Sequence, residues 1–432
     1  MMGLLRICTA GSVDDGKSTL IGRLLYDSRG VYEDQVRSVR AASGNRTAGP
    51  IDFSLFTDGL RAEREQGITI DVAYRYFATA RRKFILADTP GHEQYTRNMA
   101  TGASTSDLAI LLVDASRGVR EQTHRHARIA RLLGISKFVV AVNKMDLTGF
   151  DEDVFNAIGE DLPDVLDGAA VQAIPLSALH GDNVIAPSDR TPWYDGPALL
   201  PYLETVDAAR SRDDAPFRFP VQLVVRPDAT FRGYAGQIAS GRVRVGDEIA
   251  VWPSGKKTRV SRIVTWDGDL ETAAAPLSVT LVLADDLDIS RGDTLASGAL
   301  HVGRRFSAHV VWMDERPMQP HRPYVLKHGT RTLTAETAGV LELNQIGVVP
   351  ISTARPIVFE PYAANPTMGS FILIDPATNF TAGAGMIAGA LPDDVRGVGQ
   401  NTAERLAQAA RAAGSDDEAI DAVRAMLEEI LT

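Results

Sequence analysis

Cysteine is almost absent from this chain of 432 residues, and positive charge is in deficit. The one cysteine, Cys8, cannot form an internal disulfide, which suits a reducing compartment. The 45 Lys and Arg residues against 55 Asp and Glu residues give a net charge of −10, which argues against a general nucleic-acid-binding surface. No apolar run approaches the ~20 residues of a membrane span, and no signal-peptide pattern precedes the first predicted strand. We therefore expect a cytoplasmic protein that binds neither membranes nor nucleic acid.

The order of predicted elements divides the chain into four parts. Strand and helix signals alternate from residue 3 to about residue 206, which predicts a mainly parallel sheet wrapped by helices. A polar stretch that ends at Pro216 is typical of a linker. Short β-rich segments separated by glycine and charged turns follow, which favours compact β-barrels. We predict an α/β domain over residues 1–207, a first β-barrel over 216–303, a second β-barrel over 304–391 and a short helical tail over 392–432.

The α/β domain begins with a glycine-rich motif. Residues 11–18 read GSVDDGKS and fit the phosphate-loop pattern G-x-x-x-x-G-K-[ST], between a predicted strand at 4–10 and a predicted helix from residue 18. In that pattern backbone N–H groups surround the β-phosphate of a nucleotide, the lysine reaches the β- and γ-phosphates, and the hydroxyl holds Mg²⁺. A glycine turn with an incidental lysine is the alternative. The predicted nucleotide contacts are Gly11, Ser12, Val13, Asp14, Asp15, Gly16, Lys17, Ser18 and Thr19.

A second motif, Asp88-Thr89-Pro90-Gly91-His92, follows a predicted buried strand at 83–87. We expect Asp88 at the carboxyl end of that strand, where open α/β sheets bind ligands, and we expect it to reach Mg²⁺ through water. The N–H group of Gly91 can approach the γ-phosphate. His92 can orient the attacking water, which is the role of a glutamine in the small GTPases. A purely structural histidine is the alternative for His92.

A third motif, Asn143-Lys144-Met145-Asp146, follows a predicted strand at 137–142 and indicates the base. The carboxylate of Asp146 can accept hydrogen bonds from N1–H and the exocyclic amine of guanine, a pattern that adenine does not offer. The backbone of Ser177-Ala178-Leu179, after the apolar run 171–176, can donate to guanine O6. The three motifs together predict that the chain binds GTP and GDP with Mg²⁺ and splits the nucleotide.

Thr69 lies between the first two motifs, in the segment 63–70. On a mobile segment its hydroxyl can bind Mg²⁺ and its N–H group the γ-phosphate, so that the segment is ordered only while GTP is intact. The alternative is a β-branched residue at the start of a strand over 70–74. We predict Lys17, Thr69 and His92 as catalytic residues, and Ser18, Thr69 and Asp88 as magnesium ligands.

The motifs and the segments around them resemble the translation-factor class of GTPases, in which a nucleotide domain precedes two barrels. Within that class the chain resembles the large, GTP-binding subunits (subunit 1) of bacterial sulfate adenylyltransferase, also called ATP sulfurylase. Asp15 supports this resemblance, because elongation factor Tu characteristically has histidine at that position. The similarity extends from residue 4 to about residue 390 and is carried by residues 11–27, 65–77, 92–104, 231–236, 288–293, 378–379 and 383–387.

The resemblance implies a regulatory GTPase subunit. GTP hydrolysis would drive a separate small catalytic subunit that binds ATP and sulfate and forms adenosine 5′-phosphosulfate and pyrophosphate. We assign no adenylation residues to this chain, and it has no second phosphate loop of the kind that a fused adenylylsulfate kinase carries. The tail after residue 395 departs from the family segments. A translation elongation or initiation factor and a catalytically silent GTP-binding scaffold are the alternative functions.

Overall fold

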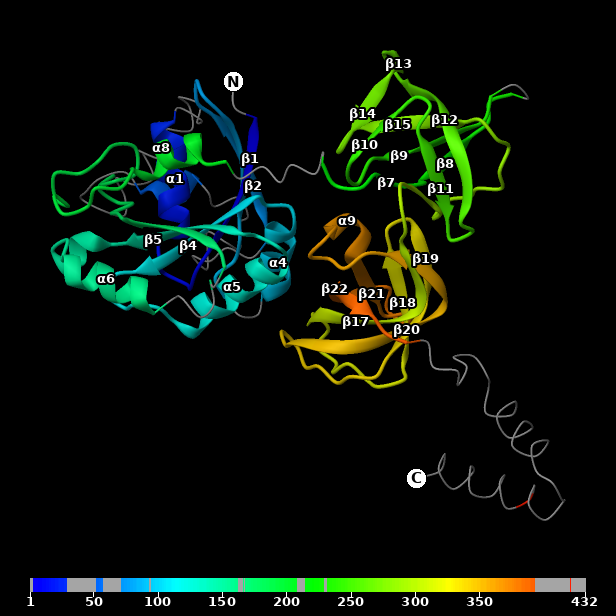
Figure 1. Cartoon of the computed structure of the whole chain (residues 1–432). Helices are drawn as coiled ribbons and strands as arrows, with labels where there is room; N and C mark the ends of the chain where they lie inside the picture. Colours follow the sequence, from blue (N-terminus) through cyan, green and yellow to red (C-terminus); the bar gives the residue numbers. More distant parts are fainter. Residues whose placement is uncertain are drawn as a thin grey trace. The chain divides into compact units, whose positions relative to one another are not determined.

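The computed structural model describes residues 3–28, 52–56, 71–92, 95–161, 166, 168–207, 214–228, 231–392 and 420 (Figure 1). The chain divides into two compact units. The first contains residues 1–214 with 311–316 and 342–346, and the second contains the rest of the chain from residue 215 onward. The predicted helical tail falls almost entirely outside the described residues. The predicted domain boundaries at 207, 303 and 391 remain predictions.

The α/β part of the first unit is built on a six-stranded sheet in the order β2-β3-β1-β4-β5-β6. Five strands are parallel, and β2 at the edge runs antiparallel to β3. This order confirms the mainly parallel sheet that the alternating pattern predicts. The bounds are β1 (Leu4–Ala10), β2 (Ala73–Ala78), β3 (Lys83–Asp88), β4 (Leu108–Asp114), β5 (Lys137–Asn143) and β6 (Ala170–Pro175), with short 3-10 helices η1 (Phe53–Phe56) and η3 (Met145–Thr148).

Helices cover both faces of this sheet. Figure 1 shows α1 (Lys17–Asp27) and α8 (Leu199–Thr205) on one face, and α4 (Thr96–Ser104), α5 (Glu121–Leu132) and α6 (Glu152–Glu160) on the other. Every residue of the central strand β4 is buried, because a strand covered on both faces has no side that can remain polar. Leucines of α1 and α8 pack with β1 in one core. Among the described helices, none has the length and apolar character needed to cross a bilayer.

The second unit begins with the strands of the first predicted barrel. An eight-stranded sheet has the order β7-β16-β11-β12-β15-β9-β8 with β13 beside β12, and β10 pairs with β14. Buried residues alternate with exposed or half-buried ones along β15, as expected when one face of a strand packs on a core. The bounds are β7 (Arg218–Pro220), β8 (Leu223–Val225), β9 (Gly233–Gln237), β10 (Arg242–Arg244), β11 (Glu248–Trp252), β12 (Lys256–Thr265), β13 (Gly268–Leu270), β14 (Thr272–Ala274), β15 (Ser278–Leu283) and β16 (Thr294–Ala296).

The next six strands form a closed barrel in the order β17-β20-β19-β18-β21-β22. Because the barrel is closed, each of its strands pairs on both sides. Its presence after the parallel sheet confirms the predicted fold class of an α/β domain followed by β-barrels. The short helix α9 (Pro366–Gly369) precedes β21. The strand bounds are β17 (His301–Trp312), β18 (Pro323–His328), β19 (Arg331–Thr337), β20 (Ile346–Phe359), β21 (Ser370–Ile374) and β22 (Thr381–Ala390).

A buried ion pair connects β7 to the residue that follows β20. Arg218 Nη2 lies 2.8 Å from Glu360 Oε1, and the two side chains are only 5% and 18% exposed. The guanidinium also donates to the carbonyls of Phe217 at 3.0 Å and Ala299 at 3.3 Å. Asn365 Nδ2 donates to the second oxygen of Glu360 at 3.2 Å. Each charge therefore has an opposite charge and further hydrogen bonds, although little of either side chain is exposed.

Replacing Arg218 by methionine should destabilise the barrels by about 3 kcal/mol, because the Glu360 carboxylate would remain buried without its cation. Urea unfolding followed by circular dichroism measures this change. The matched control is Arg259→Met, whose ion pair with Glu248 is exposed and 3.7 Å long, and we expect it to change stability by less than about 0.5 kcal/mol. Equal effects of the two substitutions would contradict the assignment of Arg218 as a buried clamp.

Candidate nucleotide-binding site

The loop between β1 and α1 needs glycine at two positions. Gly11 and Gly16 have φ angles of +141° and +94°, which residues other than glycine rarely adopt. A Cβ at Gly16 would lie 2.3 Å from Asn143 Nδ2, and one at Gly11 would lie 2.7 Å from the Leu112 carbonyl oxygen. Both glycines of the predicted phosphate-loop pattern are thus required by the backbone itself. The loop ends where α1 begins at Lys17, and no side chain among the described residues caps that helix terminus.

Lys17 carries a buried ammonium group into this loop. Its Nζ donates to the carbonyl oxygens of Gly11 at 3.1 Å and Ser12 at 2.7 Å. Burial lowers the pKa of Lys17, and the negative charges of Asp15, Asp88 and Asp14 oppose that shift. Desolvation raises the pKa of Asp15, although Lys17 and a hydrogen bond from Ser12 N–H at 2.6 Å favour its ionised form. A cation held among backbone oxygens in this way is suited to exchange those oxygens for phosphate oxygens.

His126 of α5 contacts this loop at Gly11, and it was not predicted from the sequence. Its Nδ1 accepts a hydrogen bond from Gly11 N–H at 3.2 Å, and its Nε2 lies 2.9 Å from Gln122 Nε2. Burial is the main cause that lowers the pKa of His126 to about 3, with the positive charges of Lys17 and Arg125 adding to it. The imidazole is therefore neutral, as an acceptor at Nδ1 requires. The one sequence signal is its position on the buried face of α5.

The second motif approaches the phosphate loop from β3. Asp88 is the last residue of β3 and is 1% exposed, and Thr9 Oγ1 lies 3.5 Å from its Oδ1. A Cβ at Gly91 would lie 2.4 Å from Lys17 Nζ, so the loop after β3 passes directly against the buried ammonium group. His92 follows on the surface, where its carbonyl accepts from Tyr95 N–H at 3.0 Å. Thr69 lies outside the described residues.

Asn143 connects the phosphate loop with the loop after β6. Its Nδ2 donates to the Asp15 carbonyl at 2.8 Å, and its Oδ1 accepts from Ala178 N–H at 2.9 Å. Arg23 of α1 donates to the Leu179 carbonyl at 3.2 Å, which fixes the same loop from a second side. The predicted Ser177-Ala178-Leu179 segment is thereby placed beside the phosphate loop, although the two are far apart in sequence.

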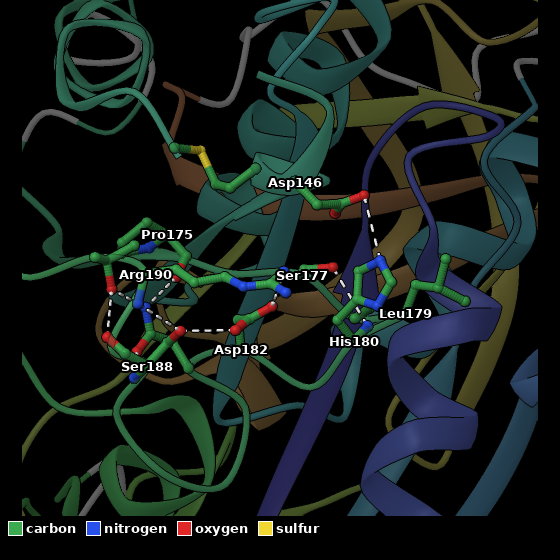
Figure 2. A network of polar contacts seen from close by, with 12 residues as sticks. Asp146, Pro175, Ser177, Leu179, His180, Asp182, Ser188 and Arg190 are labelled. Carbon is green, nitrogen blue, oxygen red and sulfur yellow. Dashed lines mark hydrogen bonds and ion pairs between the residues drawn. The ribbon is translucent and has the colours of Figure 1, made fainter. Parts of the chain in front are cut away.

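The third motif places Asp146 and Lys144 at the carboxyl end of β5. The Asp146 carboxylate is 17% exposed and faces His180, as Figure 2 shows. Lys144 has a φ of +63°, and its Nζ donates to Asp114 Oδ2 at 2.8 Å. Burial acts to raise the pKa of Asp114, but hydrogen bonds from Lys144 and Ser116 outweigh it, so the pKa lies below its usual value. Asp114 was also not predicted from the sequence.

The side chains in this site fit a phosphate chain with a hard divalent cation. Ser18 offers a hydroxyl at the start of α1 and Asp88 a buried carboxylate, and Mg²⁺ prefers such oxygen ligands. Within the described ranges, no group of three or more His, Cys, Asp or Glu side chains could hold a metal ion by itself.

Two family models and several curated proteins match this chain. The family "Elongation factor Tu GTP binding domain" matches residues 2–211, and "GTP-eEF1A C-terminal domain-like" matches residues 333–388. Sulfate adenylyltransferase subunit 1 of Aeromonas salmonicida (strain A449) is 53% identical over 407 residues, which cover 89% of this chain and 86% of that protein. The same subunit of Tolumonas auensis is 52% identical over 91% of this chain and 88% of its own length. The bifunctional enzyme NodQ of Rhizobium sp. (strain BR816) is 53% identical, but the chain spans only 64% of its length.

The buried neutral His126 should make the stability of the α/β domain depend on pH. Its pKa in the folded chain, about 3, lies below the ordinary value of 6.5. Between these pH values the unfolded chain binds a proton that the folded chain does not, so this contribution is complete above pH 6.5 and is lost as the pH falls. The loss approaches about 1.4 kcal/mol for each pH unit.

The variant His126→Asn isolates this effect, because an amide oxygen can accept from Gly11 N–H as Nδ1 does but cannot titrate. Unfolding by urea at pH values between 4 and 7 measures the difference between the two proteins. We expect wild type to lose stability relative to the variant as the pH falls. A constant difference across that range would show that His126 is not buried in its neutral form.

Proposed function

This chain belongs to the sulfate adenylyltransferase subunit 1 family, with an elongation-factor-Tu-type GTP-binding domain, and on that basis we propose that it is the GTP-hydrolysing subunit of a sulfate-activating enzyme. The observation that supports the proposal best is the link made by Asn143, which holds the phosphate loop and the Ser177-Ala178-Leu179 loop together. A phosphate site and a base site are then parts of one pocket for a single nucleotide.

The phosphate end is assigned to Lys17, Ser18 and Asp88. Backbone N–H groups of residues 13–16 and the N-terminus of α1 bind the phosphates, and the positive end of the helix dipole favours their charge. Lys17 turns its ammonium group from the Gly11 and Ser12 carbonyls to the β- and γ-phosphates. Ser18, Thr69 and Asp88 are the proposed magnesium ligands, with Asp88 acting through water. Mg²⁺ neutralises the charge that develops on the phosphates during hydrolysis.

His92 is the proposed residue that orients the attacking water. It lies on the surface directly after Gly91, and the loop that carries both residues passes against Lys17. The position of this side chain can depend on whether the γ-phosphate is present, because Gly91 can bring its N–H group close to that phosphate. Thr69 is proposed to bind Mg²⁺ through its hydroxyl and the γ-phosphate through its N–H group. Both roles make the surrounding loops sensitive to whether GTP or GDP is bound.

The base end is assigned to Asp146 with the backbone of Ser177, Ala178 and Leu179. Two hydrogen bonds from guanine to the Asp146 carboxylate select GTP and GDP over adenine nucleotides, since a half-buried carboxylate that faces the wrong base edge would lose its partners. Lys144 is directed away from Asp146 by its bond to Asp114. It thus flanks the base without competing for the Asp146 carboxylate.

GTP hydrolysis is proposed to drive adenylyl transfer on a partner subunit in the cytoplasm. The relatives are named subunit 1, which implies at least one further subunit. We propose that this partner is a small catalytic subunit that binds ATP and sulfate and releases adenosine 5′-phosphosulfate and pyrophosphate. That mixed anhydride is strongly uphill, so coupling to a second hydrolysis makes its formation favourable. The translation-factor alternative gains no support from these relatives, which cover about nine tenths of the chain.

Substituting His92 by alanine should lower the rate of GTP hydrolysis by about 100-fold or more, while the Kd for GTP changes less than about threefold. The reason is that His92 acts on the attacking water and not on the nucleotide itself. Single-turnover hydrolysis and calorimetric titration measure the two quantities. His124→Ala on α5 is the control and should change neither. Equal losses of rate and affinity in His92→Ala would show that the water-orienting role is wrong.

The proposed coupling is tested by mixing the full chain with the small adenylyltransferase subunit, ATP and sulfate. We expect GTP hydrolysis to accelerate only when all components are present, and adenosine 5′-phosphosulfate to accumulate only when GTP is hydrolysed, because the two reactions are proposed to share one cycle. Ribosomes serve as the control activator. Acceleration by ribosomes without any response to the small subunit would refute the sulfate assignment and favour a translation factor.

A further inference from the structure

The imidazole of His180 faces the carboxylate of Asp146 (Figure 2). His180 Nε2 lies 3.8 Å from Asp146 Oδ2, which is about 1 Å longer than a direct hydrogen bond. Asp146 belongs to η3 after β5, and His180 to the turn after β6. The pair therefore joins the two segments that flank the proposed base site.

The backbone on both sides of His180 is held by other contacts. His180 N–H lies 3.3 Å from Ser177 Oγ, and Gly181 N–H donates to the Ser177 carbonyl at 2.7 Å. Arg23 donates to the Leu179 carbonyl, and a Cβ at Gly181, where φ is +90°, would lie 2.3 Å from Arg23 Nη2. These contacts hold the backbone from which the imidazole extends toward the Asp146 carboxylate.

The rest of the loop is braced against β6 by a separate set of contacts (Figure 2). Ser188 Oγ donates to Asp182 Oδ1 at 2.6 Å, and Arg190 forms an ion pair with the other oxygen of Asp182 at 3.6 Å. Asn183 Nδ2 donates to the Pro175 carbonyl at 2.7 Å. These contacts stabilise the loop without reaching Asp146, which makes them a built-in comparison for His180.

The other charged groups around the loop have partners of their own. Arg23 pairs with Asp27 at 2.7 Å, Asp182 with Arg190, and Lys144 with Asp114 at 2.8 Å. Asp146 is the carboxylate that the His180 imidazole faces in the part of the chain that the structure describes. The interaction is therefore specific to the residue that recognises the base.

We propose that His180 is a positioning residue for the Asp146 carboxylate and so contributes to selectivity for guanine. This inference rests on the proposed function, in which Asp146 accepts two hydrogen bonds from the base. Both oxygens must point at the base edge at once, yet the terminal torsion of an aspartate is broad and rotates easily. A donor beside Oδ2 restrains that rotation. A movement of about 1 Å brings Nε2 within hydrogen-bond distance of Oδ2.

The experiment compares the Kd values of GDP, IDP and ADP for the full chain by calorimetric titration with Mg²⁺. IDP lacks the exocyclic amine of guanine, so it offers Asp146 one hydrogen bond where GDP offers two, while its phosphates are the same. We expect His180→Ala to weaken GDP more than IDP and to lower the ratio of the IDP and GDP Kd values by about 2- to 5-fold. His180→Gln keeps an N–H donor and should retain the wild-type ratio.

Arg190→Ala is the matched control, because Arg190 braces the same loop without facing Asp146. It should change the GDP and IDP affinities by the same factor and leave their ratio as in wild type. An unchanged ratio in His180→Ala, even with weaker binding of both nucleotides, overturns the proposal and makes His180 a purely structural residue. A wild-type chain that binds ADP as well as GDP would instead refute the proposed function, so the two failures are distinguishable.

Discussion

The geometry of the site depends on the carboxamide of Asn143. This side chain is 2% exposed, and it gives a donor to the Asp15 carbonyl and an acceptor to Ala178 N–H. Removing it would leave two buried backbone groups without partners, each at a cost of about 1–3 kcal/mol. Because one rigid amide satisfies both, the phosphate loop and the base loop keep a fixed separation. The contacts of Lys17, Asp146 and His180 depend on that fixed separation.

The parallel sheet supplies the frame for Asn143. Neighbouring parallel strands end at the same edge, so the loops after β1, β3, β5 and β6 all lie at one edge of the sheet. Every residue of β4, in the middle of the sheet, is buried. A buried lysine, Lys17, and a buried neutral histidine, His126, then contact the same residue, Gly11.

The sequence allowed the fold class to be predicted because its signals are local. The phosphate-loop pattern, the strand before it and the helix after it lie within about 25 consecutive residues, and each matches the structure. His126 and Asp114 could not be found in this way, since their partners Gly11 and Lys144 are 115 and 30 residues distant. The strand β22 lies within the predicted second barrel, but its mostly small residues give no alternating pattern that would mark its bounds. Gly385 has no side chain there, and the ring of its cross-strand partner Phe371 occupies that space.

The closed six-stranded barrel has a consequence for how other proteins can attach to it. An open sheet can pair its edge strand with a strand of a binding partner through main-chain hydrogen bonds. In this barrel the circuit from β17 through β20 to β22 returns on itself, so those bonds are already made within the chain. A protein that binds to this wall has to recognise side chains and turns instead. Recognition of that kind can be altered one residue at a time without unravelling the barrel.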